Sequence, residues 1–150
     1  MNTALWITQS LLALVYVAVG AMKTFQIVRV RAQFSWAEGR SDAFVRFVGI
    51  SETLGAFGLV LPMLTGILPW LTPLAAVGLC IIQVLAIATE HLPRKEYGAL
   101  PLNMAFLGVS LFIVFGRWIL ISQLSSEISL SVVKLISALV AAQFPRVVFY

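Results

Sequence analysis

The chain has 150 residues, of which 61% are hydrophobic and only 11% are charged, and its mean hydropathy is +1.01. A soluble domain of this length could not bury so much apolar surface, so the composition excludes a soluble protein and indicates one that lies in a lipid bilayer. The net charge of +4 does not predict a nucleic-acid partner, because the basic residues flank apolar segments and act as a signal of membrane topology.

Four apolar segments follow one another along the chain, at residues 5–25, 46–64, 70–88 and 102–120. Each is close to the roughly 20 residues that an α-helix needs to cross a ~30 Å hydrocarbon layer. The sequence therefore predicts an all-α membrane protein. Residues 1–120 would form a four-helix transmembrane bundle, and residues 121–150 would form an apolar, amphipathic tail.

The first segment is predicted to be retained as a spanning helix rather than cleaved as a signal peptide. A signal peptide carries basic residues before its apolar run, whereas residues 1–10 contain no Lys or Arg. Residues 26–37 then mix Arg29 and Arg31 with apolar side chains, which predicts a short helix lying on the membrane surface. The short, uncharged connection at residues 63–69 predicts a tight hairpin between the second and third spans.

The tail contains one further apolar stretch, residues 128–144, with Lys134 in its middle. Ile128, Val132 and Leu135 share one helical face, which gives the stretch an amphipathic pattern. We therefore predict a helix that lies at the membrane interface or packs on the bundle. A fifth crossing of the membrane is the alternative.

The distribution of basic residues predicts the orientation in the membrane. One side carries Lys23, Arg29, Arg31, Arg40, Arg46, Arg94 and Lys95, and the other side carries Arg117, Lys134 and Arg146. By the positive-inside rule, the first and third connections are expected in the cytoplasm and both termini outside. The expected location is the bacterial inner membrane.

Several kinds of self-contained site are not expected from this sequence. Cys80 is the only cysteine, which excludes a dithiol mechanism within the chain, and His91 is the only histidine. No Cys/His cluster has the spacing of a zinc site, so no metal site is expected. No dinucleotide-binding glycine motif, P-loop or nucleophile elbow occurs either, so catalytic residues are not assigned and stand-alone activity is not expected.

Each apolar segment carries small or polar residues at the spacing of one helical face. These residues are Gln9, Ala13, Tyr16, Gly20 and Lys23 in the first segment; Ser51, Gly55 and Gly58, with Glu52 beside them, in the second; Ala76, Cys80, Gln83, Ile87 and Glu90 in the third; and Asn103, Leu107, Ser110, Val114 and Arg117 in the fourth. A polar side chain that faces lipid finds no water to bond, so these faces are expected to meet inside the bundle.

Because the spans alternate in direction, five polar residues are expected in the same half of the membrane: Lys23, Glu52, Gln83, His91 and Asn103. Glu52 would lie ~9 Å below the interface at ~1.5 Å per residue, where a carboxylate needs a partner, and Lys23 is the nearest candidate. We treat all five as candidate ligand-binding residues. Simpler roles stay open. Lys23 could extend its ammonium group to the membrane surface, and Gln83 and Asn103 could serve merely to form hydrogen bonds between helices. His91 could be an ordinary interfacial residue.

Several segments occur in a recognisable order and spacing: residues 20–23, where small residues precede a lysine, 47–62, 65–76, His91, 101–103 and 116–118. Together they resemble the corresponding segments of the DoxX-like membrane proteins. The resemblance covers about residues 5–120, and the tail has no counterpart in it. It implies that the polar positions of the family fall at Lys23, Glu52, His91 and Asn103. The family is named for a subunit of an archaeal thiosulfate:quinone oxidoreductase. The resemblance therefore implies a link to membrane redox complexes, and relatives are also linked to thiol-stress responses.

We therefore expect an accessory membrane subunit of a redox system that binds a quinone-like molecule in its polar pocket. Lys23 and Glu52 would donate to and accept from the quinone oxygens, while His91 and Asn103 orient them. No cofactor is expected to be held covalently or by a recognisable motif, so electrons would come from a redox partner subunit. A second copy of the chain is a further candidate partner, in addition to the bilayer itself. A small-molecule or proton-coupled carrier and a purely structural scaffold are the alternatives.

Overall fold

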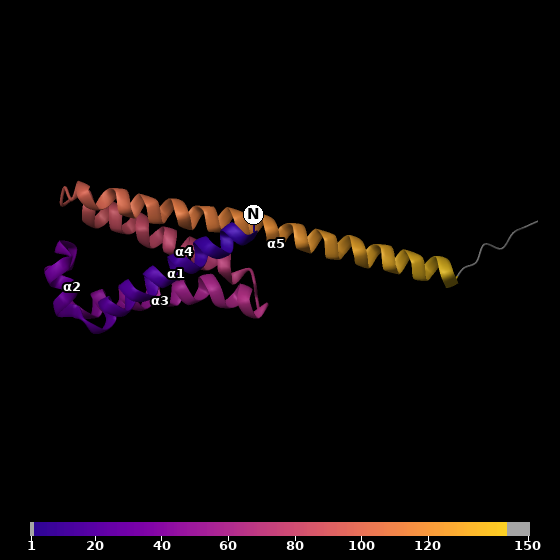
Figure 1. Ribbon diagram of the computed structural model, residues 1–150, viewed down its shortest axis with the longest axis horizontal. Helices are drawn as coiled ribbons and strands as arrows, with labels where there is room; N and C mark the ends of the chain where they lie inside the picture. The colour runs from indigo at the N-terminus through magenta and orange to yellow at the C-terminus, as the bar shows by residue number, and fades with distance from the viewer. Residues whose placement is uncertain (1, 144–150) are drawn as a thin grey trace, which may run out of the picture. The chain divides into compact units, whose positions relative to one another are not determined.

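The computed structural model describes residues 2–143, and these residues form helices and turns without any strand (Figure 1). The elements are α1 (Asn2–Phe25), α2 (Ile27–Gln33), the short helical turn η1 (Ser35–Ala37), α3 (Asp42–Thr65), α4 (Leu71–Leu85), the π-helical turn η2 (Ala86–His91), the short helical turn η3 (Tyr97–Ala99) and α5 (Leu100–Gln143). Four stretches are long and apolar enough to cross a membrane: Asn2–Phe25, Asp42–Thr65, Leu71–His91 and Tyr97–Val140. The predicted all-α membrane fold with four spanning helices is therefore confirmed.

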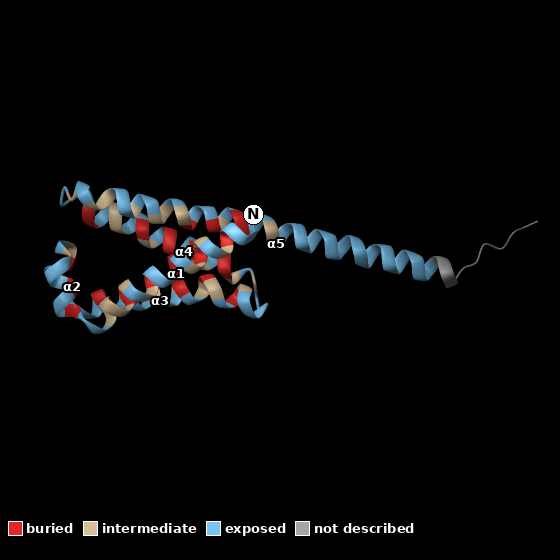
Figure 2. Cartoon of the chain, in the orientation of Figure 1, coloured by how far each residue is buried: buried red, intermediate tan, exposed pale blue. Residues whose placement is uncertain are grey.

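The chain divides into two compact units, Met1–Trp118 and Ile119–Tyr150. In the second unit, the described residues form the later part of α5, and their side chains are mostly exposed (Figure 2). Large apolar side chains are among the exposed ones, including Leu124, Ile128 and Leu135. Such a surface is expected for a helix that contacts lipid or another apolar partner.

The tail helix differs from its prediction in one respect. The sequence predicts a separate helix at residues 128–144, whereas the structure has one unbroken helix, α5, that begins at Leu100 and ends at Gln143. The reason is that no Gly or Pro occurs between residues 117 and 143, so nothing in this stretch stops a helix. Phe144 and Arg146 lie outside the described residues. The placement of the tail at the membrane interface or on the bundle stays a prediction.

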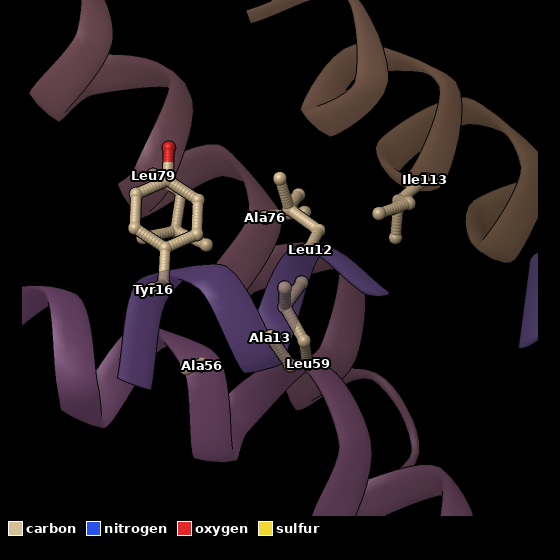
Figure 3. Packing of buried hydrophobic residues seen from close by; sticks show 8 residues of the cluster. All are labelled: Leu12, Ala13, Tyr16, Ala56, Leu59, Ala76, Leu79 and Ile113. Carbon is tan, nitrogen blue, oxygen red and sulfur yellow. The ribbon is translucent and has the colours of Figure 1, made fainter. Parts of the chain in front are cut away.

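In the first unit, a core of apolar side chains joins all four spanning helices. Its buried members are Leu12, Ala13 and Tyr16 of α1, Ala56 and Leu59 of α3, Ala76 and Leu79 of α4, and Ile113 of α5 (Figure 3). Alanine at three of these positions lets the backbones approach closely, which is the usual means of packing helices in lipid. The outward faces carry exposed Leu, Ile, Val and Phe, as lipid contact requires.

Helices α1 and α3 pack with their backbones in near contact. A Cβ atom added to Gly49 would lie 2.6 Å from the carbonyl oxygen of Gly20, and one added to Gly20 would lie 2.6 Å from the carbonyl oxygen of Gly49. These distances leave no space for a methyl group at either position. This close approach places Lys23, one turn after Gly20, opposite the turn of α3 that follows Gly49.

We expect Gly49→Ala to lower the free energy of unfolding by about 1–3 kcal/mol, because the added methyl group forces α1 and α3 apart. Gly108→Ala is the matched control: nothing lies within 4 Å of a Cβ at that position. Since Ala favours a helix over Gly, the control should gain roughly 0.5–1 kcal/mol instead. Thermal unfolding of both variants in the same detergent tests the prediction, and equal melting temperatures would contradict it.

The predicted surface helix at residues 26–37 corresponds to α2 and η1. Val30 of α2 and Ala37 of η1 are buried against Val45 of α3, with Phe34 and Trp36 packed on the same cluster. The connection to α3 ends at Ser41, whose side chain accepts a hydrogen bond from the Phe44 backbone N–H and so caps that helix. The α2–η1 segment is therefore fixed against one end of the bundle.

The buried face of α3 differs by one residue from the predicted stripe. The predicted line through Ser51, Gly55 and Gly58 is only half-buried, whereas the fully buried line runs through Gly49, Glu52, Ala56 and Leu59. Ser51, Gly55 and Gly58 therefore border the buried face rather than form its centre. Glu52, which the sequence placed beside the predicted stripe, lies at the centre of the buried face.

The third span also departs from a regular helix near its end. The predicted span at residues 70–88 is α-helical only as far as Leu85 and continues as the π-helical turn η2. A π-turn contains an extra residue per turn and often occurs at functional sites. Here it allows two consecutive residues, Glu90 and His91, to be buried together.

Candidate functional site

A cavity of about 440 Å³ lies inside the half of the bundle that α2 and η1 cover. All five predicted ligand-binding residues line it, and each comes from a different element: Lys23 from α1, Glu52 from α3, Gln83 from α4, His91 from η2 and Asn103 from α5. Aromatic side chains form much of the remaining wall, from Phe34, Trp36, Phe44, Phe47 and Phe106. Residues that are up to 80 positions apart in the sequence thus line one cavity, as the helical periodicity predicted.

A buried ion pair in the cavity wall joins Lys23 to Glu52. Lys23 Nζ lies 2.6 Å from Glu52 Oε1, and the two residues are only 8% and 3% exposed. Lys23 therefore turns inward and does not snorkel to the interface. Its ammonium group also lies 5.3 Å from the centre of the Trp36 ring, a favourable cation–π distance.

Three buried oxygen atoms of residues in the cavity wall have no hydrogen-bond partner within residues 2–143. They are Glu52 Oε2, Gln83 Oε1 and Glu90 Oε2, and the last of these lies 3.5 Å from Arg94 Nε in an ion pair. The amide nitrogen of Gln83 donates to the Tyr16 hydroxyl at 2.6 Å, and the Tyr16 ring packs on Phe106 with centroids 5.8 Å apart. Buried polar atoms in proteins are nearly always satisfied, so Glu52 Oε2 and Gln83 Oε1 suit a ligand that donates hydrogen bonds.

His91 and Asn103 are each held by a neighbour at the edge of the cavity. His91 Nδ1 lies 3.0 Å from Glu96 Oε2, and Asn103 Nδ2 donates to the carbonyl oxygen of Ala99 at 2.8 Å. The Ser35 hydroxyl donates to the other oxygen of Glu96. The Ser35 hydrogen bond and the contact with His91 hold the pKa of the Glu96 carboxyl below its usual value, so Glu96 is ionised at neutral pH.

A second group of charges links the surface segment to the end of the third span. Arg40 and Arg94 both contact the buried carboxylate of Glu90, and Arg94 also donates to the Ser35 carbonyl oxygen at 3.1 Å. Together with Glu96, these contacts tie η1 to η2 and to the connection that follows it. They close one end of the cavity with ionic side chains, while its walls are mainly apolar.

Sequence reasoning did not select Tyr16, Trp36 and Glu90 as site residues, although all three line the cavity. Tyr16 and Glu90 stand on the predicted polar stripes, so periodicity alone could have found them. Trp36 carries no such signal, because its position depends on the path of the chain through η1. The partnership of His91 with Glu96 likewise depends on the shape of a connection rather than on helical spacing.

At the other end of α1, a separate polar cluster surrounds Arg117. This residue is 0% exposed, and its guanidinium donates to the side-chain oxygens of Gln9 at 2.8 Å and Asn2 at 2.7 Å. It also lies 4.9 Å from the centre of the Trp6 ring. The sequence placed Arg117 on the polar face of the fourth span, and in the structure its side chain forms an interhelical contact between α5 and α1.

Comparison with family models gives a match to the DoxX-like family over residues 7–113. The chain belongs to the DoxX-like family. The match contains every residue that lines the 440 Å³ cavity of this DoxX-like protein, and it ends before Arg117 and the second unit. No curated protein and no solved structure matches the chain.

Proposed function

We propose that this DoxX-like chain is an accessory membrane subunit of a redox system and binds the ring of a quinone-like molecule in the 440 Å³ cavity. The observation that carries the proposal is the buried pair of Lys23 and Glu52 in a wall that is otherwise mainly apolar. Ionisable groups at membrane depth are costly, and they are found mostly where a membrane protein handles a ligand or a proton.

The size and lining of the cavity suit a flat ring with polar edges. Ligand pockets in proteins commonly measure ~300–1,000 Å³ and combine apolar walls with a few placed polar groups. Phe34, Trp36 and Phe106 offer aromatic surfaces for the ring. Lys23 has two N–H donors besides the one that Glu52 accepts, and these suit a quinone carbonyl oxygen. Glu52 Oε2 and Gln83 Oε1 are acceptors that suit the hydroxyl groups of the reduced quinol.

The redox step itself needs a partner. Conversion of a quinone into a quinol takes up two electrons and two protons, and the chain carries no motif for a redox centre that could supply the electrons. In this proposal the partner subunit delivers the electrons, while the cavity holds the ring and presents donors and acceptors to both oxygens. His91 and Asn103, at the edge of the cavity, orient the ring.

The proposed location is the bacterial inner membrane, with the cavity in its cytoplasmic half. The positive-inside rule counts basic residues that face water. Lys23 and Arg117 are buried in interhelical contacts, so neither counts. The remaining basic residues of the first unit are Arg29, Arg31, Arg40, Arg46, Arg94 and Lys95, all in or beside the first and third connections. This distribution favours cytoplasmic placement of both connections.

The test is equilibrium binding of a benzoquinone and its quinol to the purified chain in lipid nanodiscs. We expect Glu52→Gln and Lys23→Ala each to weaken binding by about tenfold or more, because each removes a charged hydrogen-bond partner. Glu38→Gln is the matched control, since Glu38 is exposed and lies outside the cavity. Unchanged binding in the Glu52 and Lys23 variants refutes the proposal. Uptake into proteoliposomes driven by a pH gradient would favour a carrier instead.

A further inference from the structure

A second hollow lies between α4 and α5, next to the ring cavity. It measures about 270 Å³ and is lined by apolar side chains, among them Val77, Ile81 and Leu85 of α4 and Leu111 and Val114 of α5, together with the Cys80 thiol. All of these residues belong to the first unit. We call this hollow the α4–α5 groove.

The groove and the ring cavity share a wall at Leu85. On α4 the cavity is lined from Ile82 onward, and the groove is lined from Val77 to Leu85. On α5 the cavity is lined at Leu102, Asn103 and Phe106, and the groove follows at Leu111 and Val114. The helices α4 and α5 run antiparallel beside each other (Figure 1). The groove therefore lies on the same side of the cavity on both helices, toward the start of α4 and toward later residues of α5. The groove extends ~12 Å along α4 at ~1.5 Å per residue.

Gly20 and Gly49 bring α1 and α3 into backbone contact, whereas α4 and α5 face each other across the groove through larger apolar side chains. The groove-lining side chains Ile81 and Leu111 are also 54% and 41% exposed. In a bilayer the groove therefore opens sideways toward the lipid, and a hydrocarbon chain can enter it without crossing a polar surface.

We propose that the α4–α5 groove holds the hydrocarbon tail of the same molecule whose ring occupies the cavity. This inference rests on the proposed function and narrows the ligand to a ring compound with a long apolar tail, such as a membrane quinone. The shared wall at Leu85 carries the inference, because an apolar hollow beside a cavity that contains polar groups matches a molecule with a polar head and an apolar tail.

The test compares two benzoquinones, one with a decyl tail and one with a methyl group in its place, on the full chain in nanodiscs. Leu111→Trp fills the groove, and Leu61→Trp on α3 is the matched control, because Leu61 is 47% exposed and lines neither hollow. We expect Leu111→Trp to weaken binding of the decyl compound about tenfold and to change binding of the methyl compound by less than about twofold. Leu61→Trp should change neither.

Photolabelling gives a second measurement that does not depend on a variant. A decyl benzoquinone with a diazirine at the tail end should label residues 77–85 and 111–114 of the wild-type chain. Labelling of other lipid-facing segments overturns the inference. So does labelling that excess phospholipid suppresses as well as unlabelled decyl quinone does, since the groove would then hold bilayer lipid.

The two proposals fail in distinguishable ways. If the methyl compound binds with Glu52 dependence but Leu111→Trp affects neither compound, the tail site is wrong and the ring site stands. If neither compound binds the wild-type chain, the proposed function falls and the tail site falls with it.

Discussion

Replacement of Lys23 by methionine is expected to lower the free energy of unfolding by about 3–5 kcal/mol, because it leaves the Glu52 carboxylate buried without a partner. Lys23 Nζ lies 2.6 Å from Glu52 Oε1, and Glu52 is only 3% exposed, so loss of the ammonium group leaves that oxygen without its partner in the protein. Methionine fills most of the volume of the lysine stem, so the loss reflects the charge rather than a cavity. The effect should exceed that of Gly49→Ala.

Thermal unfolding can be followed through Cys80, the only cysteine, which is buried in the folded chain. A fluorogenic maleimide reacts with its thiol as the bundle opens. The control is the double variant Lys23→Met with Glu52→Leu, which removes both charges and should recover stability to within about 1 kcal/mol of wild type. That double variant should nevertheless fail to bind the benzoquinone ring. A double variant that is as unstable as Lys23→Met, or that binds the ring normally, would contradict this account.

Arg117→Ala is expected to lower the free energy of unfolding by about 3 kcal/mol or more. Arg117 is the largest fully buried side chain of the described residues, and its guanidinium joins α5 to Gln9 and Asn2 of α1. Truncation removes two charge-assisted hydrogen bonds and the contact with the Trp6 ring, and it leaves a cavity next to Gln9. Removal of a buried charge offsets part of this loss, which is why the expected value lies below the sum of the separate terms.

Arg117→Lys separates charge from geometry. Lysine keeps the positive charge, but its single ammonium group cannot reproduce the two separate guanidinium contacts, so we expect an intermediate loss of stability. Because the Arg117 cluster lies at the other end of α1 from Lys23, neither variant should alter benzoquinone binding at temperatures where the bundle is folded. A loss of binding in the folded Arg117 variants would show that the two ends of the bundle are coupled.

The apolar runs and their helical spacing were enough to predict the four spans and the pairing of Lys23 with Glu52. An apolar run of about 20 residues has few alternatives to a spanning helix, because lipid offers no partner for an unpaired backbone. Helical periodicity then fixes which side chains share a face, and the alternation of direction fixes which ends meet. For this reason the sequence alone was enough to assign Lys23, Glu52, Gln83, His91 and Asn103 to one site.

Contacts that depend on turns, on helix ends or on the exact rotation of a helix could be decided only by the tertiary structure. Periodicity did not foresee the π-helical turn that buries Glu90 beside His91, the placement of Trp36 over Lys23, or the bond between His91 and Glu96. It also did not predict that Arg117 contacts Gln9 and Asn2, or that α4 and α5 leave a groove. The sequence determines which face of each helix is polar, because that follows from local spacing. How closely two helices approach, and which loop residue reaches which side chain, follows from the packing of all the elements together.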